Sequence, residues 1–76
     1  MTQLKIGSKV RITHKTDAKS LDGVRVKLEK GDELELVNEF AWGHSEDAKT
    51  LYLKCHLKNV TIKAPAWALW LCAEQV

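Results

Sequence analysis

Apolar and polar residues alternate in five short segments of the chain. These segments are residues 8–13 (SKVRIT), 23–29 (GVRVKLE), 32–37 (DELELV), 50–58 (TLYLKCHLK) and 59–63 (NVTIK). Successive side chains of a β-strand point to opposite faces, so the pattern predicts five strands, each with one buried face. The inward positions are Val10, Ile12, Val24, Val26, Leu28, Leu34, Leu36, Leu51, Leu53, Cys55, Leu57, Val60 and Ile62. We expect all of these except Leu28 to be buried together in one core.

Turn-forming residues separate these strands. Asp22-Gly23 precedes the second strand, Lys30-Gly31-Asp32 precedes the third, and Lys58-Asn59 links the last two. Glycine and asparagine tolerate left-handed backbone angles that other residues resist. Tight turns are therefore predicted at all three places.

Two connections are longer. Residues 14–23 (HKTDAKSLDG) form a polar excursion after the first strand. The segment Phe40–Lys49 (FAWGHSEDAK) combines a glycine and a serine with acidic residues, which is typical of a loop. Trp42 is an aromatic residue carried by this predicted loop.

The C-terminal residues 64–76 (APAWALWLCAEQV) break the alternation, because the stretch from Ala64 to Ala73 is apolar throughout. One interpretation is a helical turn at Pro65 followed by a strand buried on both faces. The other is a short C-terminal helix with Pro65 at its first position. Alanine and leucine favour the helix, whereas the short length and the β context favour the strand.

These elements predict one all-β domain spanning residues 1–76. The chain has no internal repeat, low-complexity tract or linker, so its five or six short strands have to pack against one another. Closure into a small barrel removes the exposed sheet edges that so short a chain cannot cover with helices.

The order of the segments resembles the Src-homology-3 (SH3) barrel over residues 8–76. Residues 28–37 (LEKGDELELV) look like the diverging turn and second strand of that family, and residues 64–71 (APAWALWL) occupy the place of its proline-containing 3₁₀ turn. The resemblance implies a five- to six-stranded barrel with a short 3₁₀ or helical turn near the C-terminus.

The SH3 family binds proline-rich peptides in an aromatic groove, and the resemblance maps part of this groove onto the chain. Trp42 stands in for the groove tryptophan, and Pro65 matches the proline of the turn. Residues 10–16 (VRITHKT) lack the tyrosines of the first strand, and Ala68, beside Trp67, replaces the tyrosine of the turn. Several rings are needed to grip a polyproline helix, so the incomplete groove argues against ordinary PxxP recognition.

The composition is that of an ordinary globular domain. The chain has 76 residues, 45% apolar and 29% charged, and no window approaches the roughly 18 apolar residues of a membrane span. The N-terminal residues 1–10 (MTQLKIGSKV) have no apolar region followed by a cleavage site. We therefore expect a cytoplasmic protein without a membrane partner, in which Cys55 and Cys72 are reduced core residues.

No arrangement of nucleophile, acid and base is visible in the sequence. Cys55 and His56 are adjacent in a predicted strand and so point to opposite faces, which argues against a Cys-His pair. His14, His44 and His56 lack the spacing of a metal site, and no glycine-rich phosphate loop is present. We expect a protein that is not an enzyme and binds no cofactor or metal.

The aromatic content favours recognition of a protein partner, as a subunit, regulator or inhibitor. Three tryptophans in 76 residues is a high content, and tryptophan often anchors interfaces. A large ring in a loop is costly to expose unless it is packed down or used for binding. The predicted partner-binding residues are Trp42, Pro65 and Trp67, with Glu39, Glu46 and Asp47 nearby to favour a basic partner segment.

The alternative is nucleic-acid binding by a basic sheet face. Its predicted residues are Lys9, Arg11, Arg25, Lys27, Tyr52, Lys54, His56 and Lys58, joined by Lys63. Outward lysines with aromatic neighbours suit phosphate contact and base stacking. However, the net charge is only +2, and only two of the twelve basic residues are arginine, which weakens the case for nucleic acid.

Overall fold

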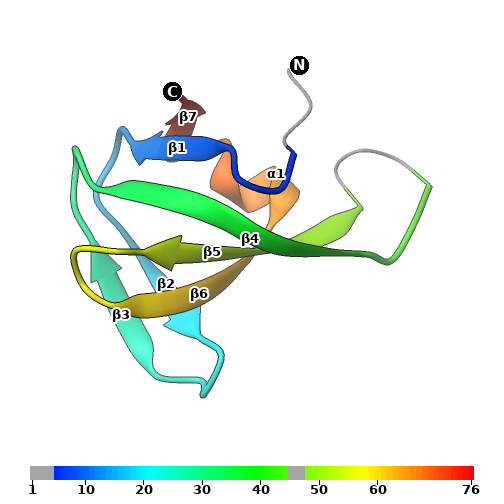
Figure 1. The fold of residues 1–76 in the computed structure, drawn as a ribbon, viewed down its shortest axis with the longest axis horizontal. Helices are drawn as coiled ribbons and strands as arrows, with labels where there is room; N and C mark the ends of the chain where they lie inside the picture. The colour runs from blue at the N-terminus through cyan, green and yellow to red at the C-terminus, as the bar shows by residue number, and fades with distance from the viewer. Residues whose placement is uncertain (1–4, 45–47) are drawn as a thin grey trace.

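The computed structural model describes residues 5–44 and 48–76. These residues form β1 (Lys9–Ile12), β2 (Thr16–Ser20), β3 (Arg25–Leu28), β4 (Glu33–Ala41), β5 (Lys49–Cys55), β6 (Val60–Pro65), α1 (Ala66–Leu69) and β7 (Ala73–Gln75). The strands make one antiparallel sheet in the order β3-β2-β6-β5-β4-β1-β7. Figure 1 shows that this sheet curls into a half-barrel.

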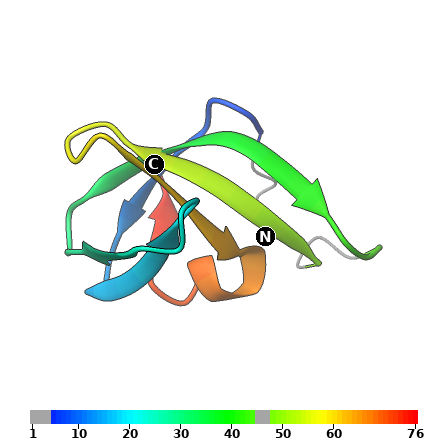
Figure 2. The same ribbon diagram turned by 90° about the horizontal axis from the view of Figure 1, so that it is seen from below.

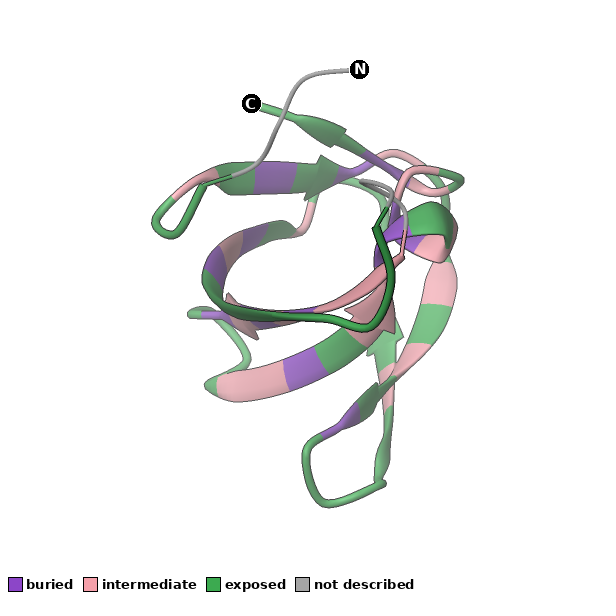
Figure 3. Ribbon diagram, turned by 90° about the vertical axis from the view of Figure 1, so that its right-hand side faces the viewer, coloured by how far each residue is buried: buried purple, intermediate pink, exposed green. Residues whose placement is uncertain are grey.

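The core lies on the concave side of the curled sheet. Its buried residues are Val10, Ile12, Leu28, Leu34, Leu36, Leu51, Leu53, Cys55, Ile62, Ala66, Leu69 and Ala73. Buried and exposed positions alternate along the strands (Figure 3), as expected for a sheet with one covered face. The predicted strand phase is therefore confirmed for nine of the inward residues, and Val26 and Val60 pack partly buried against the core.

Two predicted core residues, Val24 and Leu57, are exposed instead, to 62% and 90%. Val24 lies before the start of β3, in a turn where its N–H donates to the hydroxyl of Ser20 at 3.2 Å. Leu57 lies beyond the end of β5 at Cys55. The predicted alternation extends beyond the observed strand in both cases, before the first residue of β3 and after the last residue of β5. Cys72 is half-buried rather than a full core residue, and both cysteines are free thiols as expected.

The three predicted turns are confirmed. Gly23 and Gly31 have φ angles of 84° and 97°, and Asn59 has a φ angle of 51°. The Asp32 carboxylate accepts a hydrogen bond from the Glu29 N–H at 2.9 Å, which holds the turn around Gly31. Left-handed backbone at these positions explains the choice of residue.

The polar excursion contains a strand that the alternation did not predict. β2 (TDAKS) has only one apolar residue, yet it pairs with β3 along Thr16–Lys19 and with β6 at Lys19 and Ser20. Its inward positions are small or polar, namely Thr16, Ala18 and the buried Ser20. Tertiary pairing rather than hydrophobic pattern therefore defines this strand.

The C-terminal segment contains both predicted elements in series. Pro65 ends β6 and is the N-cap of α1 rather than its first residue. α1 lies over the concave face of the sheet (Figure 2), where Ala66 and Leu69 join the core. β7 then pairs with β1, but Glu74 and Gln75 are exposed, so the expectation of a strand buried on both faces is wrong.

The all-β prediction is confirmed at the level of a small, mostly β fold with one short helix. The described residues form seven strands rather than five or six, and the sheet is a half-barrel. The architecture is consistent with the predicted small barrel. No helix within residues 5–44 and 48–76 is long and apolar enough to cross a membrane.

Candidate functional site

A β-bulge in β4 sets the direction of its second half. Leu36 lies opposite Leu53 of β5, but the next paired residue is Asn38, which lies opposite Tyr52. Val37 is the extra residue. A bulge of one residue shifts the side-chain alternation that follows it, so Phe40 lies opposite Thr50 on the convex face.

This shift gathers exposed aromatic residues at one end of the sheet. Thr50 pairs with Phe40 of β4 on one side and with Pro65 of β6 on the other, so the three residues form one row. Trp42 extends the ladder, because its N–H donates to the Ala48 carbonyl at 2.9 Å. Trp67 follows Pro65 by two residues, in α1. Phe40 and Trp42, which we call the aromatic end, are 63% and 57% exposed, and Trp67 in α1 is 56% exposed.

The predicted acidic flank of this site is only partly placed. Glu39 lies opposite Leu51, so its side chain is on the concave side, away from Phe40. Its carboxylate pairs with the Lys49 ammonium group at 3.6 Å. Glu46 and Asp47 lie outside the described residues. Of the predicted partner-binding residues, Pro65 therefore lies in the same row as Phe40 and Trp42 continues that ladder, whereas Trp67 lies in α1 and Glu39 on the concave side.

The predicted basic face is divided, because acidic side chains pair with three of its members. Arg11 pairs with Glu33 at 3.4 Å, and His56 pairs with Glu35 at 2.8 Å. The ammonium group of Lys58 lies 3.3 Å from the Asp32 carboxylate and 2.9 Å from the Lys27 carbonyl.

Glu35 also separates two further members of the basic face, since it lies opposite Lys9 on one side and Lys54 on the other. Opposite charges alternate across this half of the sheet. A continuous field of positive charge is therefore absent from the described part of β1, β4 and β5.

A second group of cations forms an uninterrupted row across the other half of the sheet. Lys19 of β2 lies opposite Arg25 of β3 and opposite Lys63 of β6. Lys63 in turn lies opposite Tyr52 of β5. We call Arg25, Lys19 and Lys63 the cationic row. Like charges directly opposite one another in a sheet are destabilising, so the row has a cost in folding free energy.

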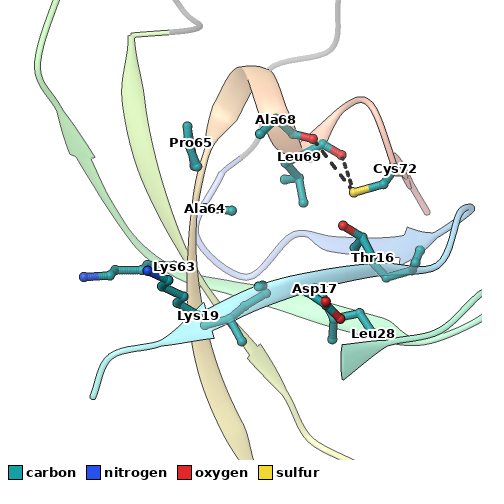
Figure 4. Close-up of a pocket in the computed structure, with 13 residues that line it drawn as sticks. Thr16, Asp17, Lys19, Leu28, Lys63, Ala64, Pro65, Ala68, Leu69 and Cys72 are labelled. Atoms are coloured by element: carbon teal, nitrogen blue, oxygen red, sulfur yellow. Dashed lines mark hydrogen bonds between the residues drawn. The ribbon is translucent and has the colours of Figure 1, made fainter. Parts of the chain in front are cut away.

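A pocket of about 290 Å³ lies beside the cationic row, between β2 and α1. The ladder between β2 and β6 ends at Lys19 and Lys63, and α1 fills only part of the space beyond it. Figure 4 shows Leu69 and Cys72 on one side of this space and Thr16 on the other. The residues lining it are Ile12, Thr16, Asp17, Ala18, Lys19, Leu28, Ile62, Lys63, Ala64, Pro65, Ala68, Leu69 and Cys72.

The residues considered for catalysis are spread over the molecule. Cys55 is completely buried, whereas His56 is exposed and bound to Glu35 on the outer face. Opposite orientation of these neighbours is therefore confirmed. His14 interacts with the adjacent Thr13 hydroxyl at 2.9 Å. Within the described ranges, no three His, Cys, Asp or Glu side chains lie close enough to hold a metal ion.

Sequence reasoning missed two residues of these surfaces, Phe40 and Lys19. Phe40 was assigned to the loop, although Asn38, Phe40 and Trp42 continue a period of two that signals a longer strand. Lys19 lies in the polar excursion, where no alternation of apolar and polar residues predicts β2. Searches of family models, of curated proteins and of solved structures found no match to this chain.

Proposed function

We propose that this protein is a small interaction module that binds a protein partner through its aromatic end. The observation that carries the proposal is the bulge at Val37, which turns Phe40 out of the concave face. If Val37 paired with Tyr52 in a regular register, Phe40 would lie opposite Lys49 on the inner side. Bulges commonly redirect side chains at functional sites, and here the redirected side chain is a large apolar ring exposed to water.

The aromatic end has the properties of an interface anchor. Phe40 and Trp42 alternate along one face of a hydrogen-bonded ladder, so their backbone is held in place before a partner binds. Rigid aromatic side chains lose little conformational entropy on binding and bury a large apolar area. Pro65, in the same row as Phe40, adds a fixed apolar surface between the strands and α1.

The SH3-like assignment is part of the same proposal. The curled sheet and the proline at the junction of β6 and α1 support it. Phe40 supplies a ring that the sequence comparison with the SH3 groove did not include. The proposed partner segment is apolar rather than polyproline, because the described rings lie along one strand and do not line a groove of parallel ridges.

The experiment is affinity capture from the native cell lysate, with and without nuclease, using the wild-type protein and two variants as baits. Phe40→Ser/Trp42→Ser removes the aromatic end, and Leu57→Ser removes a more exposed apolar side chain just beyond the other end of β5. A protein retained by the wild type and by Leu57→Ser, insensitive to nuclease and lost with the double variant, is the expected result. Equal retention by all three baits would contradict the proposal.

Nucleic-acid binding is the second candidate, and the cationic row is the observation that favours it. The row runs directly into Tyr52, a stacking position. If it binds single strands, affinity should fall steeply with salt, and Lys19→Glu/Lys63→Glu should abolish binding while Arg11→Glu, at a paired position, has a smaller effect. Failure to bind any DNA or RNA of a panel at low salt would eliminate this candidate.

A further inference from the structure

A hollow lies on the convex face of the sheet, where the bulge of β4 adjoins β5 and β6. Its volume is about 390 Å³, which is within the range of roughly 300–1,000 Å³ for small-molecule sites. The residues lining it are Leu21, Val37, Asn38, Tyr52 and Thr61. Val37 is the extra residue of the bulge, so the irregularity that turns Phe40 outward also forms part of this hollow.

The hollow combines an aromatic ring with aliphatic side chains. Tyr52 lies on β5, directly opposite Lys63 of β6. Leu21 and Val37 are 55% and 39% exposed. The Leu21 N–H donates to the Thr61 carbonyl at 3.3 Å, which holds the turn between β2 and β3 beside β6. A flat ligand would therefore find a ring to stack on and apolar groups at its edges.

Polar groups in the hollow suit a nucleobase better than a plain hydrocarbon ring. The Asn38 amide oxygen accepts a hydrogen bond from the Glu39 N–H at 2.9 Å, which leaves the amide nitrogen to donate elsewhere. Within residues 5–44 and 48–76, no hydrogen bond engages that nitrogen or the Thr61 hydroxyl. Unpaired bases carry donors and acceptors along their edges, and proteins recognise them by stacking together with such hydrogen bonds.

The cationic row leads away from the hollow on the same face of the sheet. Lys63 lies opposite Tyr52, Lys19 lies opposite Lys63, and Arg25 lies opposite Lys19. Figure 4 shows the side chains of Lys19 and Lys63 extending away from the space between β2 and α1. Neighbouring strands are about 4.8 Å apart, so the row covers about 14 Å of the sheet from β5 to β3.

No acidic partner compensates the cationic row within the described part of the chain, because no ion pair engages its three members there. The acidic residue nearest to Lys19 along β2 is Asp17, and it lies opposite Lys27 of β3. Like charges directly opposite one another have a cost in folding free energy. Binding of a polyanion along the row would offset this cost.

We propose that this face binds single-stranded nucleic acid, with one base stacked on Tyr52 in the hollow and the phosphates beside it on the cationic row. A phosphorylated aromatic residue of a protein would share the ring and one phosphate, but it has no second phosphate to continue along the row. The proposal rests on the second candidate function, whose base site it names, and it is independent of the aromatic end.

The probe is single-stranded hexaadenylate, titrated at low salt into the ¹⁵N-labelled protein and followed by NMR. Saturable shifts are expected at the amides of Asn38, Tyr52, Thr61 and Lys63, together with intermolecular NOEs between adenine protons and the Tyr52 ring. Adenosine monophosphate has one phosphate, and linear polyphosphate has no base. Each should therefore bind at least roughly tenfold more weakly than hexaadenylate.

Variants test the ring and the cations separately. Tyr52→Leu keeps the apolar bulk and should weaken hexaadenylate binding roughly tenfold, whereas Tyr52→Phe keeps the ring and should bind as the wild type does. Lys19→Gln/Lys63→Gln removes two phosphate contacts, so the slope of log affinity against log salt should fall in magnitude by about 1.4. Lys9→Gln, at a cation opposite Glu35, is the matched control and should leave the slope unchanged.

The outcomes separate failure of the base site from failure of nucleic-acid binding. Absence of saturable hexaadenylate binding at low salt would overturn the proposal together with the second candidate function. Salt-dependent binding that is unchanged in Tyr52→Leu, or equalled by polyphosphate, would overturn the stacked base and leave that candidate standing.

Two further results would assign the hollow to another ligand and so overturn the proposal. Adenosine monophosphate that binds as tightly as hexaadenylate would indicate a free nucleotide, and phenyl phosphate that does so would indicate a phosphorylated aromatic residue of a protein. If Tyr52→Leu does not fold, NOEs from adenine to the Tyr52 ring of the wild type still decide, since their absence contradicts stacking.

Discussion

Phe40 lies opposite Thr50, one position away from the register that an unbroken β4 would give it. The shift arises at Val37, and it decides whether the ring enters the concave side or faces solvent. Deletion of Val37 removes the extra residue, so it should abolish the bulge while Asn38 stays opposite Tyr52. Cross-strand NOEs should therefore join Phe40 to Thr50 in the deletion variant, in Val37→Ala and in the wild type alike. NOEs from Phe40 to Lys49 in the wild type would show that Val37 pairs regularly with Tyr52 and that no bulge sets the direction of Phe40.

Leu53 and Leu57 are both inward positions in the alternating sequence of residues 50–58, but they differ in burial. Leu53 is completely buried and Leu57 is exposed. Leu53→Ala should lower the free energy of unfolding by about 2–5 kcal/mol, because it leaves a cavity in the core. Leu57→Ala should change it by less than about 0.5 kcal/mol. Urea denaturation of both variants measures the difference, and comparable losses would mean that β5 extends beyond Cys55.

Gly31 has a φ angle of 97°, and nothing lies within 4 Å of the place where a Cβ atom would stand. Gly31→Ala should therefore destabilise the protein by about 1–2 kcal/mol through backbone strain alone. Gly31→Asn should cost less, because asparagine tolerates left-handed angles. A neutral Gly31→Ala variant in thermal unfolding would contradict the turn geometry between β3 and β4.

Because the charges of the cationic row repel one another, replacing a lysine by glutamate should have opposite effects on stability at Lys63 and at Lys54. Lys63→Glu places an acid opposite Lys19 and should stabilise the protein by about 0.2–1 kcal/mol. Lys54→Glu places an acid opposite Glu35 and should destabilise it by a similar amount. Denaturation at low ionic strength shows both effects most clearly, since salt screens exposed charges. Equal signs for the two variants would contradict the register of β2 against β6.

The sequence predicted the strands whose inward residues are large and apolar. TLYLKCHLK predicted the buried positions of β5, and Gly23, Gly31 and Asn59 predicted the turns. It could not predict β2, because Thr16, Ala18 and Ser20 bear no hydrophobic pattern and the strand is defined by pairing with β3 and β6. Strand ends were also missed at Leu57 and Val24, since alternation in the sequence continues where hydrogen bonding stops.

Only part of each candidate surface could be predicted from the sequence, because strand pairing places the other residues. Trp42 and Trp67 were recognised from residue type alone, and both are exposed. Phe40 was missed because it lies in the predicted loop, and its direction could not be predicted because a bulge is an insertion relative to the partner strand and has no signature within β4 itself. The cationic row was missed because cross-strand neighbours such as Lys19 and Lys63 are distant in the sequence, and only the register brings them together.

The central claim is that the aromatic end binds a protein, and the affinity of Trp42→Ala for the captured partner tests it most directly. Trp42 is exposed and lies outside the core, so the variant should unfold at nearly the wild-type temperature. The dissociation constant of the variant should be roughly 30-fold higher than that of the wild type, equivalent to about 2 kcal/mol, as for an interface hot spot. A stable Trp42→Ala variant with unchanged affinity would contradict the claim, as would a variant that unfolds because Trp42 belongs to the core.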